Sequence, residues 1–405
     1  MVSKNIAKLH RSASKKSRLI IGLMSGTSLD GLDIALCKIT GSGTGTKLDL
    51  AKFTTVPYSK ATKDRIKMIF AKPQISFLSF TELNAWIGIE HGRMILEALK
   101  GWKIKPTQID AIASHGQTVF HAPMAITKGA TLNSTFQAGD GDHLAVTTRI
   151  ITLSDFRQKH IAAGGEGAPL AVYGDYLLFS KKGEDRIMLN IGGIGNFTYL
   201  PASCDPMKVF VTDTGPGNTM IDQVVQHQFP DRDFDKDAEL AKEGTVDSRF
   251  LKALKANKFF KLPFPKTTGP ELFNLGYLRD LALGMDVTHI DVRHMLATLT
   301  RFSAETMAEA ILKTIGRSKR FHIYVSGGGA HNPLMIDWIK ELLPNAKFHT
   351  MDELTSIRGV KGLGDAKEAV LFALLANETL SGGNINFGRR SKIPNVTMGK
   401  ISFPN

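Results

Sequence analysis

Three glycine-rich turns, each directly after a short apolar run, are the segments of this 405-residue chain best suited to binding an anion. They span residues 22–33, 190–196 and 326–332. Glycine lets the backbone approach a ligand closely and lets successive N–H groups point at one charge. Each turn by itself also fits an ordinary structural turn. Together they predict a nucleotide held between two lobes through its phosphates.

The first turn adds side-chain chemistry to its glycines, since it has two hydroxyl donors and the carboxylates Asp30 and Asp33, which suit a hydrated cation. No lysine follows its last glycine, so it is not a Walker A loop. A polar hairpin is the alternative. The candidate nucleotide-binding residues, with Asp30 also the candidate metal ligand, are Gly26, Thr27, Ser28, Leu29, Asp30, Gly31, Leu32, Asp33, Asn190, Gly192, Gly193, Asn196, Gly327, Gly328, Gly329 and Asn332.

One carboxylate, Asp213, stands between the apolar run 209–211 and a Gly-Pro-Gly turn. A carboxylate there projects from the end of a strand. Such a group can act as a general base that takes a proton from an attacking oxygen. The same position also fits an aspartate that stabilises its own loop through an Asx-turn. The residues alone leave both interpretations open.

A second polar group follows the predicted buried strand 109–114 and has donors and acceptors suited to a polar ligand. Its members are Ser114, His115, Gln117 and Thr118. Arg157 is the candidate for a bidentate contact with a substrate carboxylate. A structural salt bridge from Arg157 to Asp155 or Glu166 fits the sequence equally well.

The elements that must position these side chains alternate between strands and helices. The apolar patterns predict strands at 19–23, 33–39, 109–114, 186–191, 196–200 and 321–325, and helices at 81–99, 292–315 and 365–377. Asn332 and Pro333 are typical of the N-cap and first residue of a further helix. The strand–glycine turn–strand plan occurs twice, which predicts an α/β architecture with two similar halves.

The composition is that of a globular protein, with 42% apolar residues and a net charge of +13. Residues 1–18 contain six basic and no acidic residues, and the segment from 379 onward contains four and none, which leaves +3 for the body. Both ends lack periodicity, so they are predicted to be disordered or loosely packed tails, with an organellar transit-like peptide as the alternative for the first. Neither has the interleaved aromatic residues of a nucleic-acid site, and the first has no apolar stretch for a secretory signal.

No apolar run reaches the length of about 18 residues that a membrane-spanning helix requires. The two cysteines, Cys37 and Cys204, form neither a disulfide framework nor a metal-binding spacing. Their number favours a reducing compartment. We therefore expect a small-molecule ligand, with no nucleic-acid or membrane partner.

Taken together, these motifs resemble those of the anhydro-N-acetylmuramic acid kinase family. The resemblance runs from about residue 20 to 378, in the family's order, through residues 26–33, 114–118, 155–157, 162–170, 190–196, 213–218 and 327–332. It implies the actin/hexokinase-type (ASKHA) ATPase fold, with two ribonuclease-H-like lobes and ATP in a central cleft. The three turns would then be the two phosphate motifs and the adenosine motif.

The resemblance also implies a reaction. Asp213 would activate a water that attacks the anomeric carbon of 1,6-anhydro-N-acetylmuramic acid, and the freed O6 would attack the γ-phosphate of ATP. The products would be N-acetylmuramic acid 6-phosphate and ADP, with Mg²⁺ neutralising the phosphates. Arg157 would meet the lactyl carboxylate. Members resemble cytoplasmic homodimers that recycle bacterial cell-wall sugars.

Three positions leave questions about the sugar site. His160 and Glu166 stand where the family usually has Asp and Gln, which leaves the exact sugar open. Glu368 matches a family glutamate and is a candidate substrate contact. Asp365 and Glu368 also have the spacing of a capping box at a helix start. We favour this structural role for Glu368 over a substrate contact.

Several rival functions remain on the sequence alone. A kinase of another anhydro sugar, such as levoglucosan, would share most of these motifs. An amino-sugar kinase, in which a sugar hydroxyl attacks ATP, is the next alternative. A non-catalytic ATPase of the actin or chaperone type would have no use for Asp213 or for residues 114–118.

The predicted domain organisation begins with a basic tail, residues 1–18. A first lobe spans 19–156 and is joined by the C-terminal segment 378–405. A second lobe, with Asp213, spans 157–377.

Overall fold

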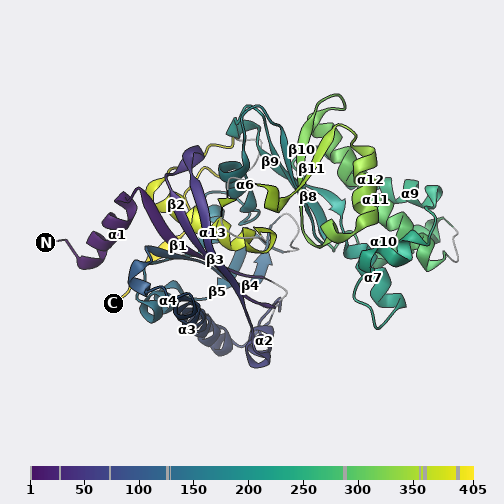
Figure 1. Cartoon of the computed structure of the whole chain (residues 1–405). Helices are drawn as coiled ribbons and strands as arrows, with labels where there is room; N and C mark the ends of the chain where they lie inside the picture. The colour runs from purple at the N-terminus through teal and green to yellow at the C-terminus, as the bar shows by residue number, and fades with distance from the viewer. Residues whose placement is uncertain are drawn as a thin grey trace. The chain divides into compact units, whose positions relative to one another are not determined.

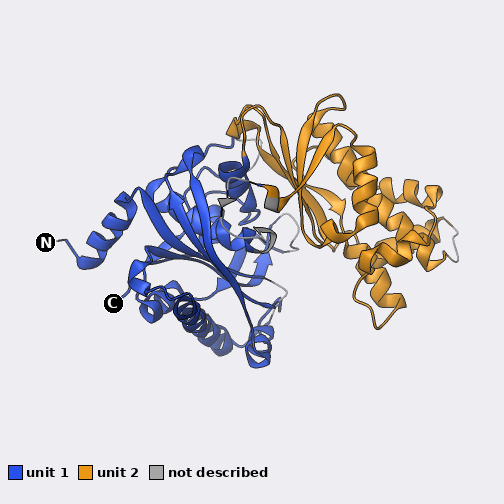
Figure 2. Ribbon diagram, viewed as in Figure 1, with its two compact units in different colours: residues 1–179, 354–405 blue, residues 180–353 orange. Residues whose placement is uncertain are grey.

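The computed structural model describes residues 2–26, 29–72, 74–124, 127, 129–285, 290–354, 357–358, 363–388 and 393–405. The chain forms two compact units (Figure 2). Unit 1 comprises Met1–Phe179 and Leu354–Asn405, and unit 2 comprises Ser180–Glu353. These boundaries differ from the predicted ones at 156/157 and 377/378, because the segments 157–179 and 363–377 pack within unit 1.

Unit 1 is built on an eight-stranded sheet with the order β12-β3-β2-β1-β4-β6-β13, and β5 pairs with β4. The strands are β1 (Ser17–Ser25), β2 (Gly31–Thr40), β3 (Lys47–Pro57), β4 (Ala111–Ala122), β5 (Ser134–Ala138), β6 (Thr152–Ser154), β12 (Ile357–Arg358) and β13 (Lys400–Ser402). The helices are α1 (Lys4–Ser14), α2 (Lys60–Lys67), α3 (Phe77–Gly101), α4 (Gly141–Thr148), α5 (Phe156–Ala162), α6 (Ala171–Phe179) and α13 (Leu363–Ser381).

Helices cover both faces of this sheet, as Figure 1 shows for α3 and α13. Alternate residues of β1 face opposite ways, so Ile21 and Leu23 join the apolar core that α3 covers. Gly22 faces α13, and a Cβ atom there would lie 1.9 Å from the carbonyl oxygen of Ala369. Glycine at this position therefore allows the helix to approach the strand.

The basic N-terminal segment is not the loose tail that we predicted, because residues 4–14 form helix α1. Its end is fastened by Asp110, whose carboxylate accepts hydrogen bonds from Ser12 Oγ (3.2 Å), Lys15 Nζ (2.5 Å) and the backbone N–H of Leu19 (3.0 Å). The C-terminal segment is also partly ordered, since β13 pairs with β6. Three basic residues of this segment lie outside the described residues, namely Arg389, Arg390 and Lys392.

Unit 2 is built on a five-stranded sheet with the order β11-β10-β7-β8-β9. The strands are β7 (Arg186–Ile191), β8 (Ile194–Leu200), β9 (Phe210–Pro216), β10 (Phe321–Ser326) and β11 (Ala346–Thr350). The helices are α7 (Thr219–Gln228), α8 (Glu239–Lys242), α9 (Ser248–Lys255), α10 (Leu275–Gly284), α11 (Val292–Ile315) and α12 (Pro333–Leu342). Helix α11 packs Leu296, Leu299 and Phe302 into the same buried core as Leu189 of β7.

The two sheets share one topology. In each, three consecutive strands form an antiparallel meander, and the next two core strands run parallel to the first. Thus β3-β2-β1-β4-β6 in unit 1 corresponds to β9-β8-β7-β10-β11 in unit 2. This repeated ribonuclease-H-like order confirms the predicted α/β architecture with two similar halves. Among the described residues, no helix is both long and apolar enough to cross a membrane.

Candidate active site

In unit 1, four buried side chains form a hydrogen-bonded relay behind the first glycine turn. The Oγ of Ser25, at the end of β1, donates to Gln117 Oε1 and lies 2.7 Å from the hydroxyl of Tyr58, which lies 2.7 Å from His91 Nε2. Because each hydroxyl has a single proton, the donors run in order from His91 to Tyr58, Ser25 and Gln117. Burial lowers the pKa of His91 to about 4, so its ring is neutral at pH 7.

The relay ends on the backbone of the first turn, since Gln117 Nε2 donates to the carbonyl oxygens of Gly26 (3.2 Å) and Thr118 (3.0 Å). Thr27 and Ser28, two predicted nucleotide-binding residues, lie outside the described residues. The side chains of Leu29 and Leu32 are buried in the core, so these residues can contact a ligand through their backbone only.

The two acidic residues of the first turn differ in their surroundings. Asp30 is exposed, and its carbonyl oxygen accepts a hydrogen bond from the N–H of Tyr58 (3.0 Å). Asp33 follows Gly31 and Leu32 on β2, and its carboxylate accepts a hydrogen bond from Thr55 Oγ1 (2.6 Å). Asp30 is therefore the more accessible carboxylate.

Arg157, on α5, is held at two points in unit 1. Its Nε donates to His115 Nε2 (2.9 Å), and its Nη1 donates to the carbonyl oxygen of Gly167 (3.0 Å). Within the described residues it forms no ion pair with Asp155 or Glu166, so the predicted structural salt bridge is wrong. Asp155 pairs instead with Lys400 (3.0 Å). The guanidinium keeps donors beyond these two contacts.

His160 fastens the other side of the same loop, because its Nδ1 accepts the backbone N–H of Gly167 (3.0 Å). This bond places the ring proton on Nε2, which is buried and has no hydrogen-bond partner among the described residues. His115 Nδ1 is likewise buried and has no hydrogen-bond partner among the described residues. Burial, with Arg157 nearby, lowers the pKa of both histidines, so both rings are neutral at pH 7.

The structure corrects our interpretation of Glu368. Helix α13 begins at Leu363, so Asp365 lies inside the helix and is not its N-cap residue. Glu368 is exposed to solvent, yet desolvation raises the pKa of its carboxyl group. The charge of Arg157 opposes that rise, and that of Asp33 adds to it. These three side chains therefore share one electrostatic environment.

The remaining predicted sugar-site residues lie on β4. Ser114 is buried opposite Leu23 of β1, and Thr118 Oγ1 accepts a hydrogen bond from Gln137 Nε2 (3.3 Å). Between them, Gly116 has a φ of +76°, and a Cβ atom there would lie 2.7 Å from the carbonyl oxygen of Ala138. Glycine at this position therefore permits the irregularity that turns this polar segment out of regular pairing.

In unit 2, the structure brings the second and third glycine turns together. Gly192 and Gly193 join β7 to β8, and their carbonyl oxygens accept N–H bonds from residues 217–219 at the start of α7 (2.8–3.1 Å). Gly327 has a φ of +85°, and a Cβ atom there would lie 2.6 Å from the carbonyl oxygen of Ile191. A Cβ atom at Gly329 would lie 2.2 Å from Cγ2 of Ile191.

Side-chain amides surround these two turns. Asn190 accepts a hydrogen bond from Ser326 Oγ (3.3 Å), Asn218 lies beside Gly328, and Asn196 pairs with Asp213 across β8 and β9. Asn332 caps α12, as predicted, through Oδ1 and the N–H of Met335 (2.9 Å). A 3₁₀ turn, Gly328–His331, separates the glycines from that helix.

Asp213 lies on β9, half-buried, with its two carboxylate oxygens in different environments. Oδ2 accepts the backbone N–H of Thr268 (2.8 Å), whereas Oδ1 has no donor among the described residues. Burial raises the pKa of Asp213 to about 6; Glu271 also raises it, while the Thr268 hydrogen bond and the charge of Lys266 lower it. A carboxylate with this pKa is mostly ionised at pH 7 and can accept a proton.

Sequence reasoning missed Tyr58 and His91, which are linked to the predicted site residue Gln117 through Ser25 and only in the folded chain. It also missed Lys266 and Thr268. A signal for Lys266 was present, since it follows three phenylalanines within residues 259–264. A charged residue in such a run is a candidate for burial among aromatic rings.

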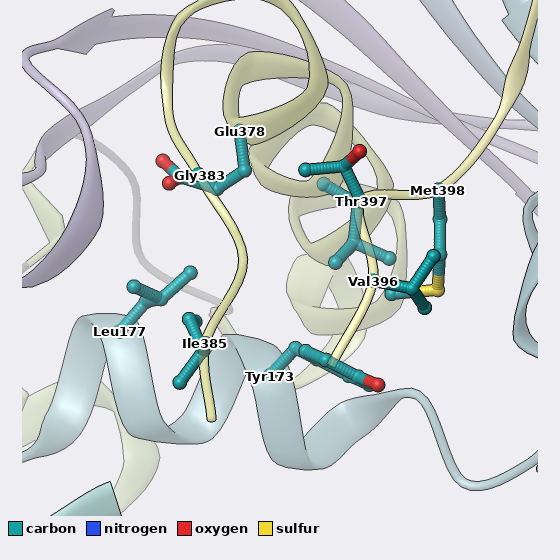
Figure 3. Close-up of a pocket in the computed structure, with 9 residues that line it drawn as sticks. Tyr173, Leu177, Glu378, Gly383, Ile385, Val396, Thr397 and Met398 are labelled. Atoms are coloured by element: carbon teal, nitrogen blue, oxygen red, sulfur yellow. The ribbon is translucent and has the colours of Figure 1, made fainter. Parts of the chain in front are cut away.

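A cavity in unit 1 does not coincide with these residues (Figure 3). Its volume is about 10 Å³, enough for roughly one water molecule. It is lined by Tyr173, Leu177, Leu375, Glu378, Gly383, Ile385, Val396, Thr397 and Met398. It is too small for a sugar or a nucleotide.

Comparison with known proteins identifies the family. The profile of the anhydro-N-acetylmuramic acid kinase family matches residues 18–397. The chain belongs to this family. Proteins named anhydro-N-acetylmuramic acid kinase include one from Pseudoalteromonas atlantica, 53% identical over 100% of both chains, and one from Pseudoalteromonas translucida, 48% identical over 98% of this chain and 99% of that one. A hexokinase from Schistosoma mansoni solved with glucose covers 90% of this chain and 86% of its own, with 12% identity and a TM-score of 0.32.

Family membership makes this chain an enzyme of the kinase class. The residues present fit a nucleotide, because Gly193, Gly327 and Gly328 leave backbone exposed beside the amides of Asn190 and Asn218. Backbone N–H groups and amide side chains are the donors that phosphates and nucleosides need. The exposed carboxylate of Asp30 has the oxygen chemistry that Mg²⁺ prefers.

Proposed function

We propose that this protein opens 1,6-anhydro-N-acetylmuramic acid with water and phosphorylates its O6 with ATP, giving N-acetylmuramic acid 6-phosphate and ADP. The observation that supports this most directly is the Asp213 carboxylate, with one oxygen held by a backbone N–H and the other without a donor in the described part of the chain. Membership of the family supplies the reaction, and the carboxylate supplies the base that the reaction requires.

In this reaction Asp213 Oδ1 takes a proton from a water as the water oxygen bonds to the anomeric carbon of the sugar. The bond between that carbon and O6 breaks, and O6 takes the γ-phosphoryl group as ADP leaves. The proton taken by Asp213 is later released to solvent. A positioned base contributes about 10²–10⁴-fold to such a step. Alignment of water, sugar and phosphate contributes as well.

Residues of unit 1 are proposed to bind the sugar. Arg157 has guanidinium donors left for the lactyl carboxylate, and its position is fixed by His115 and Gly167. Ser114, His115, Gln117, Thr118 and Glu368 are the proposed partners of the other polar groups. His160 supports the Gly167 loop with one nitrogen, as a carboxylate oxygen would, so its presence leaves the support of Arg157 in place.

ATP is proposed to bind through the three glycine turns, with Asn190, Asn196, Gly192, Gly193, Gly327, Gly328, Gly329 and Asn332 in unit 2 and residues 26–33 in unit 1. Asn332 would act mainly through its backbone, because its side chain caps α12. Asp30 would hold Mg²⁺ through water, and the ion would neutralise charge on the phosphates. We also propose a cytoplasmic homodimer, as the family resemblance implies.

A coupled assay of ADP release tests the proposal with three sugars: anhydro-N-acetylmuramic acid, levoglucosan and N-acetylglucosamine. We expect turnover with the first. Preference for levoglucosan would assign the chain to a different anhydro sugar, and no turnover with either anhydro sugar would contradict the proposal. Because levoglucosan lacks the lactyl group, it also tests the role of Arg157.

A further inference from the structure

We propose that the segment Lys266–Thr268 is the positioning element of the base: its backbone fixes the Asp213 carboxylate, and the ammonium of Lys266, held in a cage of phenylalanine rings, anchors the segment with a positive charge. This inference rests on the proposed role of Asp213. Lys266 does not touch the reacting atoms in this proposal and acts only through Asp213.

The segment is fastened to β9 by a ladder of hydrogen bonds that joins Lys266 and Thr268 to Thr212 and Asp213. The N–H of Asp213 donates to the carbonyl oxygen of Lys266 (3.0 Å), and the N–H of Lys266 donates to Thr212 Oγ1 (3.1 Å). Two residues later, the N–H of Thr268 donates to Asp213 Oδ2 (2.8 Å). These bonds fix one carboxylate oxygen and leave Oδ1 as the free proton acceptor.

Lys266 anchors this ladder although its side chain is only 9% exposed. Its Nζ donates to the carbonyl oxygen of Phe259 (3.0 Å) and lies 4.2, 5.5 and 5.4 Å from the ring centres of Phe259, Phe260 and Phe264. Aromatic faces attract cations, and the attraction grows when the cation is desolvated. The cage therefore holds a charged group among apolar rings.

If Lys266 only anchored the loop, its positive charge would not be needed. Of the groups around it, Asp213 favours the charged form of Lys266, and Lys313, which also lies over the Phe264 ring (5.1 Å), opposes it. Burial, the largest influence, lowers the pKa of Lys266 to about 8, so the ammonium is still mostly protonated at pH 7. This charge in turn favours the ionised form of Asp213.

Few other charged groups lie near Lys266 and Asp213 in the part of the chain that the structure describes. Glu271, on the same loop, raises the pKa of Asp213 and so opposes Lys266. Lys258 and Lys261 are exposed on the neighbouring 3₁₀ turn Lys258–Lys261. The β8 residue opposite Asp213 is Asn196, which is uncharged. Among these, Lys266 is the one cation that acts on the Asp213 carboxylate.

The test compares the charge of Lys266 with its packing, using Lys266→Met, Lys266→Gln and Lys266→Arg. We expect the two neutral variants to raise the acid midpoint of the pH profile of kcat/KM by about 0.5–1 unit, because the carboxylate loses a stabilising cation. At pH 6 a shift of one unit lowers the ionised fraction, and with it the rate, about fivefold. Lys266→Arg should keep the midpoint of the natural enzyme.

Thermal unfolding separates this effect from loss of structure. Methionine can fill the phenylalanine cage without a buried charge, so Lys266→Met should melt no lower than the natural enzyme. Lys266→Gln gives the same neutral comparison if the methionine variant does not fold. Lys313→Met is the matched control, since it removes a cation from the same ring but should leave the acid midpoint unchanged.

The outcomes distinguish this inference from the proposed function. Neutral variants with the natural acid midpoint, alongside an inactive Asp213→Asn, would overturn the role of Lys266 and leave the base in place. So would a midpoint shift in Lys266→Arg as large as that in Lys266→Met, because packing would then explain it. An active Asp213→Asn would overturn the base itself.

Discussion

Units 1 and 2 share a strand order, yet they hold their functional side chains by different physical means. Unit 1 uses neutral groups: the relay from His91 through Tyr58 and Ser25 to Gln117 contains no charge at pH 7. Unit 2 uses a buried cation, a carboxylate and backbone bonds around Asp213. One fold has therefore produced a rigid neutral support in one unit and a titratable support in the other.

This difference separates two kinds of sensitivity. A buried neutral network loses stability when one member is removed, since its partners are left without hydrogen bonds. Burial and nearby charges instead change the proton affinity of a titratable group. The pKa of His91 lies near 4, whereas those of Asp213 and Lys266 lie near 6 and 8. Changes in pH near neutrality should thus act on unit 2.

The largest effect should come from Asp213→Asn, which removes the proposed base while keeping its size. We expect kcat to fall at least about a hundredfold, with ATP binding retained. Turnover would be measured by ADP release and ATP affinity by calorimetry. Asp222→Asn in α7 is the matched control, because burial also raises the pKa of Asp222 to about 6. Equal losses in both variants would refute a specific role for Asp213.

A smaller effect is expected on the sugar side, in unit 1. Arg157→Lys keeps the charge but cannot bond His115, Gly167 and a carboxylate together, since it lacks the planar fork of donors. We expect kcat/KM for anhydro-N-acetylmuramic acid to fall about 10- to 100-fold with little change in the KM for ATP. Levoglucosan, which lacks the carboxylate, should show a smaller loss. An equal loss on both sugars would mean that Arg157 is only structural.

Local sequence signals predicted the helices and strands whose ends are set by the residues next to them. Helix α11 matches the predicted range 292–315, because its apolar periodicity runs without interruption to Gly316, whose φ of +91° ends it. Strand β7 matches 186–191 for a similar reason, with glycines directly after it. The two similar halves also followed from the repeated strand–glycine turn–strand plan.

The predictions that failed depend on contacts distant in the sequence. Helix α1 is fastened by Asp110, about a hundred residues away, which its own composition does not reveal. The proposed cap at Asp365 failed because α13 begins two residues earlier, at Leu363. Asp213 was identified from its motif, but its Thr268 hydrogen bond joins residues 55 positions apart.

A stability effect should dominate in the relay of unit 1. Tyr58→Phe leaves both His91 and Ser25 without their shared hydroxyl, so we expect the free energy of unfolding to fall by about 1–3 kcal/mol. Chemical denaturation measures this. The control is Tyr199→Phe in unit 2, a half-buried tyrosine whose hydroxyl donates to Asp185 (2.8 Å). A loss in Tyr199→Phe as large as that in Tyr58→Phe would contradict the importance of the relay.

The smallest effect is expected at α1, on the surface of unit 1. Lys15 is half-exposed, and its ion pair with Asp110 is screened by water, so Lys15→Met should cost less than about 1 kcal/mol of unfolding free energy. Asp110 keeps its bonds to Ser12 and to the backbone of Leu19, which is why the loss stays small. Lys16→Met, at an exposed neighbour, is the control, and both variants should keep natural kinetics. A loss of activity in Lys15→Met alone would mean that α1 acts on the catalytic site, and that the support of unit 1 extends beyond its buried relay.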